Sequence, residues 1–201
     1  MKSKNLKKDF NIIIIGIGGQ GQITLLEILS EAAFSEGYQV KTSELHGLSQ
    51  RGGSVEAQIR FGKEIFSPLV FQAGADLILA LEMHEALRGL YYANKNSQFL
   101  INKYLLPIPG QPSLSENEIL NEIKKFTQKI NLVPANEICK KELGNEVLAG
   151  IYLISFATFK GLIPIKPNSL EKAIKKMIPE KYLELNLKTF NFARSQFISK
   201  G

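Results

Sequence analysis

Cysteine and histidine are scarce in this sequence of 201 residues, which contains one cysteine, two histidines and no tryptophan. The single thiol, Cys139, cannot form an internal disulfide. It also cannot by itself hold an iron–sulfur cluster, because such clusters take several cysteine thiolates. With only His46 and His84 as imidazoles, a preformed zinc site is not expected. The chain is therefore expected to bind no metal cofactor alone.

Long apolar runs are also missing. The stretches Asn11–Ile15 and Asp76–Leu81 are far shorter than the roughly 20 residues that a membrane-spanning helix needs. The first eight residues are rich in lysine and lead into a strand-like run broken by Gly16, and not into the apolar region of a signal peptide. We expect a cytoplasmic protein with no membrane partner.

The chain is basic, with a formal net charge of +6 and a pI near 9.3. A basic chain can bind nucleic acid or another anionic partner. The positions of the lysines indicate whether this chain does so. They are mixed with glutamates on expected helical faces, without interleaved aromatic residues, and gather in the first eight residues, Lys124-Lys125, Lys140-Lys141 and Lys175-Lys176. This placement is typical of a solvated surface and predicts no nucleic-acid partner.

Strand and helix patterns alternate along the chain, and 44% of its residues are hydrophobic. A β-branched run without polar alternation, at Phe10–Ile15, is typical of a buried strand in a parallel sheet. The expected strands are Phe10–Ile15, Tyr38–Ser43, Val55–Phe61, Ala75–Leu81, Gln98–Asn102, Leu105–Ile108 and Asn131–Pro134. We predict one domain, residues 1–201, with an α/β fold: a Rossmann-like, mostly parallel open sheet, flanking helices and C-terminal helices.

A strongly apolar helix is expected at Val147–Phe159. A helix so apolar is buried or lies in an interface. If this helix packs against a partner subunit, its apolar surface is exposed when the chain is isolated. Exposed apolar surface favours self-association, so we predict a homo-oligomer for the isolated chain.

The first candidate site is a glycine turn between the first strand and a helix expected to begin near Gln20. Its residues are Gly16, Ile17, Gly18, Gly19, Gln20 and Gly21, which fit the pattern G-x-G-x-x-G. Glycines there allow a tight turn and bring backbone amides at a helix N-terminus close to a phosphate.

Two interpretations of this turn stay open. One is a stand-alone oxidoreductase that binds NAD or FAD at the turn, with Glu44, at the end of the second strand, on the ribose. The other is a tight turn that packs the helix on the sheet and meets an anion or the backbone of a partner. Gln20 inside the motif favours the second interpretation.

The second candidate site is the segment Ser43–Ser54, which is dense in polar residues and paired glycines. Loops at the carboxyl ends of parallel strands are where α/β proteins place their sites. His46 can donate or accept a proton, and Arg51 can clamp a carboxylate or phosphate. The candidate catalytic residues are His46, Gln50 and Arg51, and the candidate cofactor-binding or interface residues are Gly52, Gly53 and Ser54 together with the first turn. A structural alternative is an Arg51–Glu44 pair that ties the loop to the domain.

The two motifs together resemble the gamma-subunit family of 2-oxoacid:ferredoxin oxidoreductases, in which a G-x-G-G-Q-G turn precedes a loop ending in R-G-G or R-G-A. The form S-E-x-H-G-x-x-Q-R-G-G-S-V, present from Ser43 to Val55, looks like the indolepyruvate branch. Further resemblance lies in Asn145-x-Val147 with its apolar helix and in the closing segment with Asn186 and Phe190.

The resemblance implies a catalytic complex rather than a complete enzyme. Thiamine diphosphate and iron–sulfur clusters would reside on a large partner subunit, which decarboxylates an aryl pyruvate, uses CoA as co-substrate and passes two electrons to ferredoxin. The isolated chain is then expected to be inactive, with its two motifs facing the partner or CoA. Two alternative hypotheses remain: a stand-alone oxidoreductase that binds NAD or FAD, and an interaction domain that binds a different protein.

Overall fold

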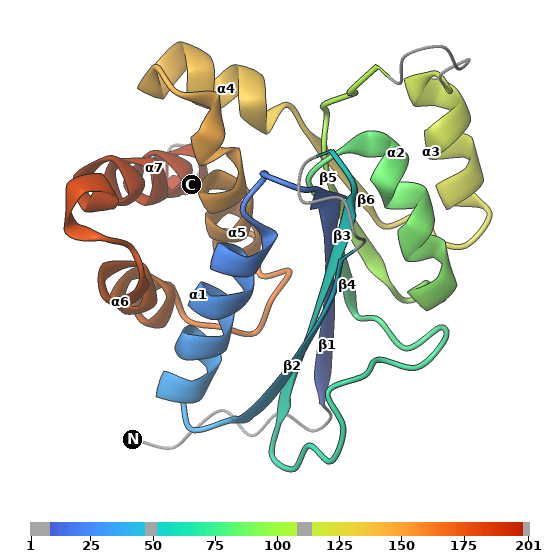
Figure 1. Cartoon of the computed structure of the whole chain (residues 1–201), viewed down its shortest axis with the longest axis horizontal. Coiled ribbons are helices and arrows are strands. Elements are labelled where there is room, and N and C mark those ends of the chain that lie inside the picture. Colours follow the sequence, from blue (N-terminus) through green and yellow to red (C-terminus); the bar gives the residue numbers. More distant parts are fainter. Residues whose placement is uncertain (1–8, 47–51, 108–113, 199–201) are drawn as a thin grey trace.

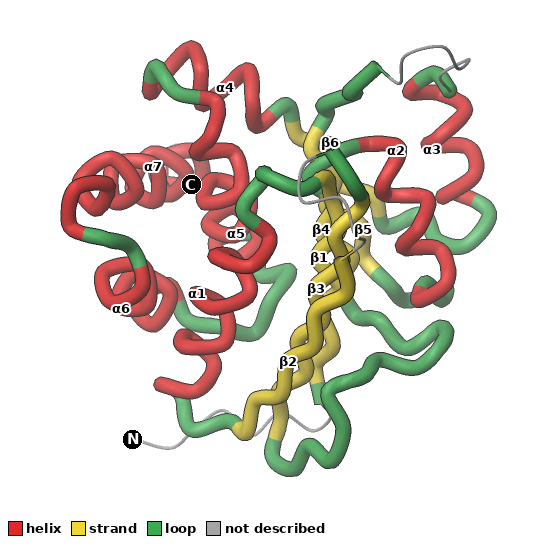
Figure 2. The backbone as a smooth tube through the Cα atoms, viewed as in Figure 1, coloured by secondary structure: helices red, strands yellow, loops and turns green. Residues whose placement is uncertain are grey.

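A six-stranded sheet forms the centre of the computed structural model, which describes residues 9–46, 52–107 and 114–198 (Figures 1 and 2). The strand order is β2-β3-β1-β4-β5-β6. The pairs β1–β4, β4–β5 and β5–β6 are parallel, whereas β3 pairs antiparallel with both β1 and β2. The strands are β1 (Phe10–Ile17), β2 (Gln39–His46), β3 (Ser54–Gly62), β4 (Leu77–Ala80), β5 (Gln98–Asn102) and β6 (Ile130–Val133).

Helices cover both faces of the sheet (Figure 1). One face carries α1 (Gln22–Ser35), α4 (Ala135–Leu143), α5 (Ala149–Phe159), α6 (Pro167–Met177) and α7 (Glu180–Ile198). The other face carries α2 (Met83–Ala86), the 3-10 helix η1 (Leu87–Tyr92) and α3 (Glu116–Lys124). A second 3-10 helix, η2 (Glu146–Leu148), leads into α5. The predicted α/β class with a mostly parallel open sheet is confirmed.

The isoleucines of β1 explain why the sheet is covered twice. Ile12 and Ile14 pack into the core under α1 and α5, while Ile13 and Ile15 pack into the core under α2, η1 and α3. All four side chains are fully buried. Successive residues of a strand point to opposite faces, so an unbroken apolar run fits a strand buried on both sides.

Strand β3 departs from the Rossmann arrangement, because it lies between β1 and β2 and runs against both. The seven residues between His46 and Ser54 form a short connection. A parallel crossover needs a dozen or more residues, so the strand after so short a connection pairs antiparallel. Glu44 pairs with Ala57 of β3 and is thereby separated from β1 by a whole strand.

The apolar helix α5 belongs to the core. Its residues from Ala149 to Ser155 are buried, as are Ala157 and Thr158. Of the two places predicted for this helix, core or interface, the structure shows the core, because α1, α4, α6 and α7 pack around it. Self-association of the isolated chain stays a prediction. The strand expected at Leu105–Ile108 is not formed over Leu105–Pro107, and residue 108 lies outside the described residues.

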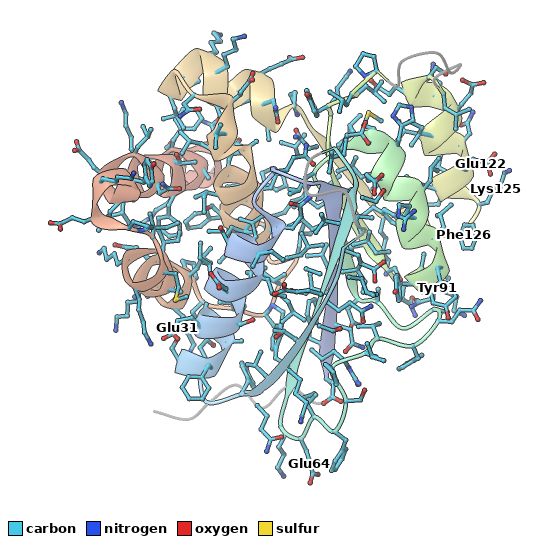
Figure 3. The ribbon with its side chains drawn as sticks, in the orientation of Figure 1. Glu31, Glu64, Tyr91, Glu122, Lys125 and Phe126 are labelled. Atoms are coloured by element: carbon cyan, nitrogen blue, oxygen red, sulfur yellow. The ribbon has the colours of Figure 1, made fainter. Side chains whose placement is uncertain are left out.

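The polar face of β3 is covered by the connection between β3 and β4, residues 63–76. Gln58 accepts a hydrogen bond from the backbone N–H of Val70 at 2.7 Å, and Arg60 donates to the carbonyls of Ser67 and Leu69. These hydrogen bonds fix the backbone of the connection, whose large apolar side chains Phe66, Leu69 and Phe71 are exposed. Tyr91, which Figure 3 shows at the outer surface, is exposed as well.

Candidate functional site

The two glycine-containing motifs meet at the carboxyl edge of the sheet. The backbone N–H of Gly18 donates to the carbonyl of Gly53 at 2.8 Å, directly beyond the last β1–β3 pair, Ile17 with Ser54. The antiparallel pairing of β1 and β3 therefore places the first turn against the end of the second motif. Residues that are more than 30 positions apart in the sequence form one continuous edge.

Gln20 fills the inside of the glycine turn. Its carboxamide oxygen accepts from the backbone N–H of Ile17 at 2.8 Å, and its nitrogen donates to the carbonyl of Leu81 at 3.3 Å. A methyl group at Gly16 would lie 2.6 Å from the Gln20 oxygen and 2.6 Å from the nitrogen of Gln22. A side chain at residue 16 would therefore displace the carboxamides of Gln20 and Gln22 from their hydrogen bonds within the turn. This packing supports the tight-turn interpretation.

Two further glycines of the turn adopt backbone angles that other residues rarely take. The φ angles of Gly19 and Gly21 are 104° and 82°. Gly21 is also the N-cap of α1, so no side chain caps this helix, and its first turn holds no acidic residue. Among the described residues, no side chain therefore accepts from the backbone N–H groups at the start of α1, which lies at the carboxyl edge.

Glu82 follows β4 and collects hydrogen bonds from three directions. One carboxylate oxygen accepts from the backbone N–H of Leu106 and contacts the Nδ1 of His84, each at 3.0 Å. The other oxygen accepts from the N–H of Glu85 at 2.9 Å and so caps α2. Because the carboxylate is an acceptor, the Nδ1 of His84 is the donor in this pair. Glu82 is only 1% exposed and holds the segment after β5 against the start of α2.

Asn102 plays a similar part at the end of β5. Its side-chain nitrogen donates to the carbonyl of Leu81 at 3.1 Å and to the side-chain oxygen of Asn136 at 2.6 Å. Its oxygen accepts from the N–H of Ala135 at 3.0 Å, at the first residue of α4. The carbonyl of Leu81 therefore accepts hydrogen bonds from the side-chain nitrogens of both Asn102 and Gln20. These hydrogen bonds link the glycine turn to β4, β5 and α4.

Ser54, a predicted site residue at the start of β3, is tied to α2. Its hydroxyl donates to Glu85 at 2.7 Å, and the second Glu85 oxygen lies 3.5 Å from the Nε of Arg88. Burial raises the pKa of the Glu85 carboxyl above its ordinary value, while the Ser54 hydrogen bond and the Arg88 charge oppose the shift. The carboxyl thus carries a higher proton affinity in the folded chain than in the unfolded chain.

This raised pKa predicts a pH-dependent gain from Glu85→Gln. The Glu85 carboxyl binds a proton more strongly in the folded chain than in the unfolded chain. The free energy of unfolding therefore falls as the pH rises from the ordinary pKa of the carboxyl toward its raised pKa. The variant cannot ionise, so we expect it to unfold at higher urea than the wild type at neutral pH, and the difference to shrink in acid.

Glu118→Gln supplies a control of opposite sign. Hydrogen bonds from the hydroxyl and backbone N–H of Ser115 lower the pKa of Glu118. Its contribution to stability is therefore present above its ordinary pKa and lost in acid. Glu118→Gln is expected to destabilise the chain at neutral pH only. Equal effects of the two variants at all pH values would contradict the assignment.

Two hollows lie next to the glycine turn and share Gly19, Gln20, Val147 and Gly150 in their walls. The smaller, about 150 Å³, has the polar side chains of Asn102, Tyr104, Asn136 and Glu146 among its lining residues. The larger, about 490 Å³, opens between α1, the start of α5 and the start of α7. Val147, 80% exposed, stands between the two.

The remaining predicted site residues are only partly placed. His46 ends β2, where it pairs with Val55, and its side chain lies outside the described residues, as do Gln50 and Arg51. In the described ranges no three His, Cys, Asp or Glu side chains gather closely enough to hold a metal ion. Across the same ranges, no helix is long and apolar enough to cross a membrane.

Sequence reasoning did not find Glu82, Glu85 and Asn102 as residues of this edge. A signal was available, because Glu82 and Asn102 are polar residues that directly follow or end apolar strands. The carboxyl ends of parallel strands meet at one edge of a sheet, so such residues gather there. Their roles here are to hold backbone groups in place.

Comparisons with known proteins agree with this geometry. Residues 11–196 match the family described as pyruvate ferredoxin/flavodoxin oxidoreductase. Indolepyruvate oxidoreductase subunit IorB of Archaeoglobus fulgidus is 35% identical over 194 residues, covering 94% of this chain and 96% of the relative.

Solved structures share the fold. The gamma subunit of a keto/oxoacid ferredoxin oxidoreductase from Geobacter sulfurreducens has a TM-score of 0.68 at 22% identity, covering 94% of this chain and 99% of that one. A 2-oxoglutarate:ferredoxin oxidoreductase from Magnetococcus marinus has a TM-score of 0.72 at 17% identity, covering 96% of this chain but 32% of that one. The predicted resemblance is confirmed, and the chain belongs to the pyruvate ferredoxin/flavodoxin oxidoreductase family.

Proposed function

We propose that this chain is the small subunit of a complex that oxidises indolepyruvate or a related aryl pyruvate to an acyl-CoA and passes the electrons to ferredoxin. The name of the Archaeoglobus fulgidus relative, an indolepyruvate oxidoreductase subunit, supports the substrate class. The alignment covers 96% of that subunit, which supports the subunit role. We propose that the chain forms one domain and that the complex is cytoplasmic. Without its partner, the chain is expected to be inactive.

The observation that carries this proposal is the construction of the carboxyl edge. The Gly18–Gly53 hydrogen bond joins the two family motifs into one surface, and Gln20 and Asn102 fix that surface to the sheet. Large apolar side chains stand exposed on it, with Val147 at 80% and Leu45 at 56%. An exposed apolar surface of this kind suits burial against a larger subunit.

The donor groups of this chain do not fit an iron–sulfur cluster. Cys139 is fully buried, and burial raises the pKa of its thiol to about 12, so it stays protonated at neutral pH. A thiolate is the form that binds iron. We therefore assign the clusters and thiamine diphosphate to the large partner, where thiamine diphosphate would supply the decarboxylation chemistry.

In this proposal, the chain packs against the thiamine diphosphate site of the large subunit and helps to enclose it. The uncapped N–H groups at the start of α1 and the backbone of Gly52 and Gly53 are the groups that would meet the partner or CoA. His46, Gln50 and Arg51 stay the candidates for direct contact with substrate. Gln20, Ser54 and Glu82 position this surface through the hydrogen bonds described above.

The test is recovery of the partner from native cells with a tagged chain. The wild type is expected to bring down a large subunit with thiamine diphosphate, iron and arylpyruvate-dependent dye reduction. Val147→Asp is expected to lower that recovery by about tenfold or more, because it places a charge in an apolar interface. Phe34→Asp is the matched control, since Phe34 is 67% exposed at the far end of α1 and should leave recovery unchanged.

Other outcomes would favour the rivals. A partner without thiamine diphosphate or iron would indicate an interaction domain that serves another protein. A lone chain with bound NAD or FAD would indicate the stand-alone oxidoreductase. The geometry does not favour the latter, because Gln20 fills the glycine turn and β3 separates Glu44 from β1.

A further inference from the structure

In the described part of the chain, one fully buried side-chain oxygen has no hydrogen-bond partner, and it belongs to Glu85 of α2. The other oxygen of this carboxyl accepts from the hydroxyl of Ser54 at 2.7 Å. The Nε of Arg88 lies 3.5 Å from the unpartnered oxygen, too far for a good hydrogen bond, and the Arg88 side chain is 58% exposed. Buried polar atoms are nearly always paired, so this oxygen needs an explanation.

The surroundings of Glu85 compensate its charge only weakly. Strands β1, β4 and β5 pack against α2 and contain no charged residue. The groups that act on the Glu85 carboxyl are the Ser54 hydroxyl, Arg88, Glu82 and His84. Other charged residues on neighbouring elements are Glu116, Glu118, Glu122 and Lys124 on α3, and Glu56 and Arg60 on β3. Because burial dominates, the pKa of Glu85 is raised, and its ionised form is held at a cost in stability.

A glutamine at this position would fill similar space without that cost, but it would not reproduce the bond to Ser54. A carboxylate can only accept, so the Ser54 hydroxyl must donate to it, and the bond is charge-assisted. A carboxamide or a protonated carboxyl can donate as well as accept, so the hydroxyl could then turn either way. The ionised form of Glu85 thus fixes the hydroxyl hydrogen inward and leaves the lone pairs of the Ser54 oxygen free to accept.

Ser54 lies where the two family motifs join. It is the first residue of β3, pairs with Ile17 of β1 and is half-buried. It directly follows Gly53, whose carbonyl accepts from the N–H of Gly18 at 2.8 Å. The orientation of its hydroxyl is therefore set at the carboxyl edge itself.

We propose that Glu85 is a positioning residue that keeps the Ser54 hydroxyl as an acceptor at the carboxyl edge, for an N–H or O–H donor of the large subunit. Protonation of Glu85 releases this orientation, so docking weakens in acid. The orientation of Ser54 is a property of the isolated chain, whereas the docking step rests on the proposed function.

The first test follows the side-chain carboxyl carbon of Glu85 by NMR during a pH titration of the isolated chain. Its signal is identified by its absence in Glu85→Gln. The midpoint is expected above the ordinary pKa of a glutamate and is expected to rise further in Ser54→Ala, because the Ser54 hydrogen bond favours the ionised form. Ser115→Ala is the matched control. It removes the hydroxyl that bonds Glu118, so it should raise the midpoint of Glu118 and leave that of Glu85 unchanged.

The second test measures the affinity of the tagged chain for the large subunit as a function of pH. Wild-type affinity is expected to fall as the pH drops through the pKa of Glu85. Glu85→Gln is expected to bind about tenfold more weakly at neutral pH and to lose this pH dependence, although it should unfold at higher urea than the wild type. Ser54→Ala should lose about as much, and the double variant no more than either single one.

Glu122→Gln makes the same chemical change at an exposed position of α3 and should leave the affinity unchanged. A Glu85 midpoint that stays the same in Ser54→Ala would overturn the positioning role. Wild-type affinity in Glu85→Gln, or losses that add in the double variant, would overturn the docking role. If the wild-type chain recovered no large subunit, the proposed function would fail, and the carboxyl titration alone would decide whether Glu85 positions Ser54.

Discussion

Replacing Glu82 with alanine is expected to lower the free energy of unfolding by about 3 kcal/mol. The carboxylate is almost fully buried and receives the N–H groups of Leu106 and Glu85 together with the Nδ1 of His84. Its removal takes the acceptor away from these part-buried donors, and each buried unpaired donor costs about 1–3 kcal/mol. Urea unfolding at neutral pH measures the change.

The control for this prediction is Glu122→Ala on α3. Glu122 pairs with Lys125 at the outer surface, where Figure 3 shows both side chains pointing away from the sheet. An exposed pair three residues apart contributes about 0.5 kcal/mol or less. If Glu82→Ala cost no more than Glu122→Ala, the carboxylate would not hold the segment after β5 in place.

Asn102→Leu is expected to cost about 3 kcal/mol as well, for a different reason. Leucine has a similar size, so the loss comes from the hydrogen bonds to Leu81, Ala135 and Asn136 and not from a cavity. Because Asn102 joins β5 to the start of α4, hydrogen exchange at Ala135 should also become faster.

The comparison for Asn102 is Asn168→Leu. Asn168 is exposed on α6, and substitutions at such positions usually change stability by less than about 0.5 kcal/mol. A similar cost for both variants would mean that the polar contacts of Asn102 contribute little. Protection of Ala135 that stays unchanged in Asn102→Leu would lead to the same conclusion.

Much of the fold could be predicted because its signals are local. The isoleucine run of β1 and the glycine turn after it predicted a buried strand followed by a helix, and both are present. The direction of β3 was missed, although the short connection from His46 to Ser54 already excluded a parallel crossover. The sequence did not decide whether α5 lies in the core or in an interface, because helices in both places have the same apolar pattern.

The candidate site was predictable only in its outline. The motifs located the carboxyl edge, but the Gly18–Gly53 hydrogen bond depends on how β1 and β3 pair. Gln20 looked like a departure from a nucleotide motif. Its actual partners are Ile17, at the end of β1, and Leu81, directly after β4. Contacts of this kind depend on tertiary register, which a pattern of residue types does not contain.

The family resemblance carried further than any single motif. A glycine turn or an R-G-G loop is compatible with several protein classes, whereas the pair in fixed order identified the family. The match over residues 11–196 and the relative at 35% identity confirm that identification. The assignment of individual site residues stays a prediction, because Gln50, Arg51 and the side chain of His46 lie outside the described residues.

The place of β3 also governs the order in which this sheet can form. Among the described strands β2 pairs only with β3, which comes later in the chain. A nascent chain that ends at residue 46 therefore cannot form this pair. Strands β2 and β3 are close in sequence and have the lowest loop-closure cost, so they can pair first and then dock onto β1 through β3. The parallel pairs with β4, β5 and β6 need longer crossovers and follow from the other side of β1.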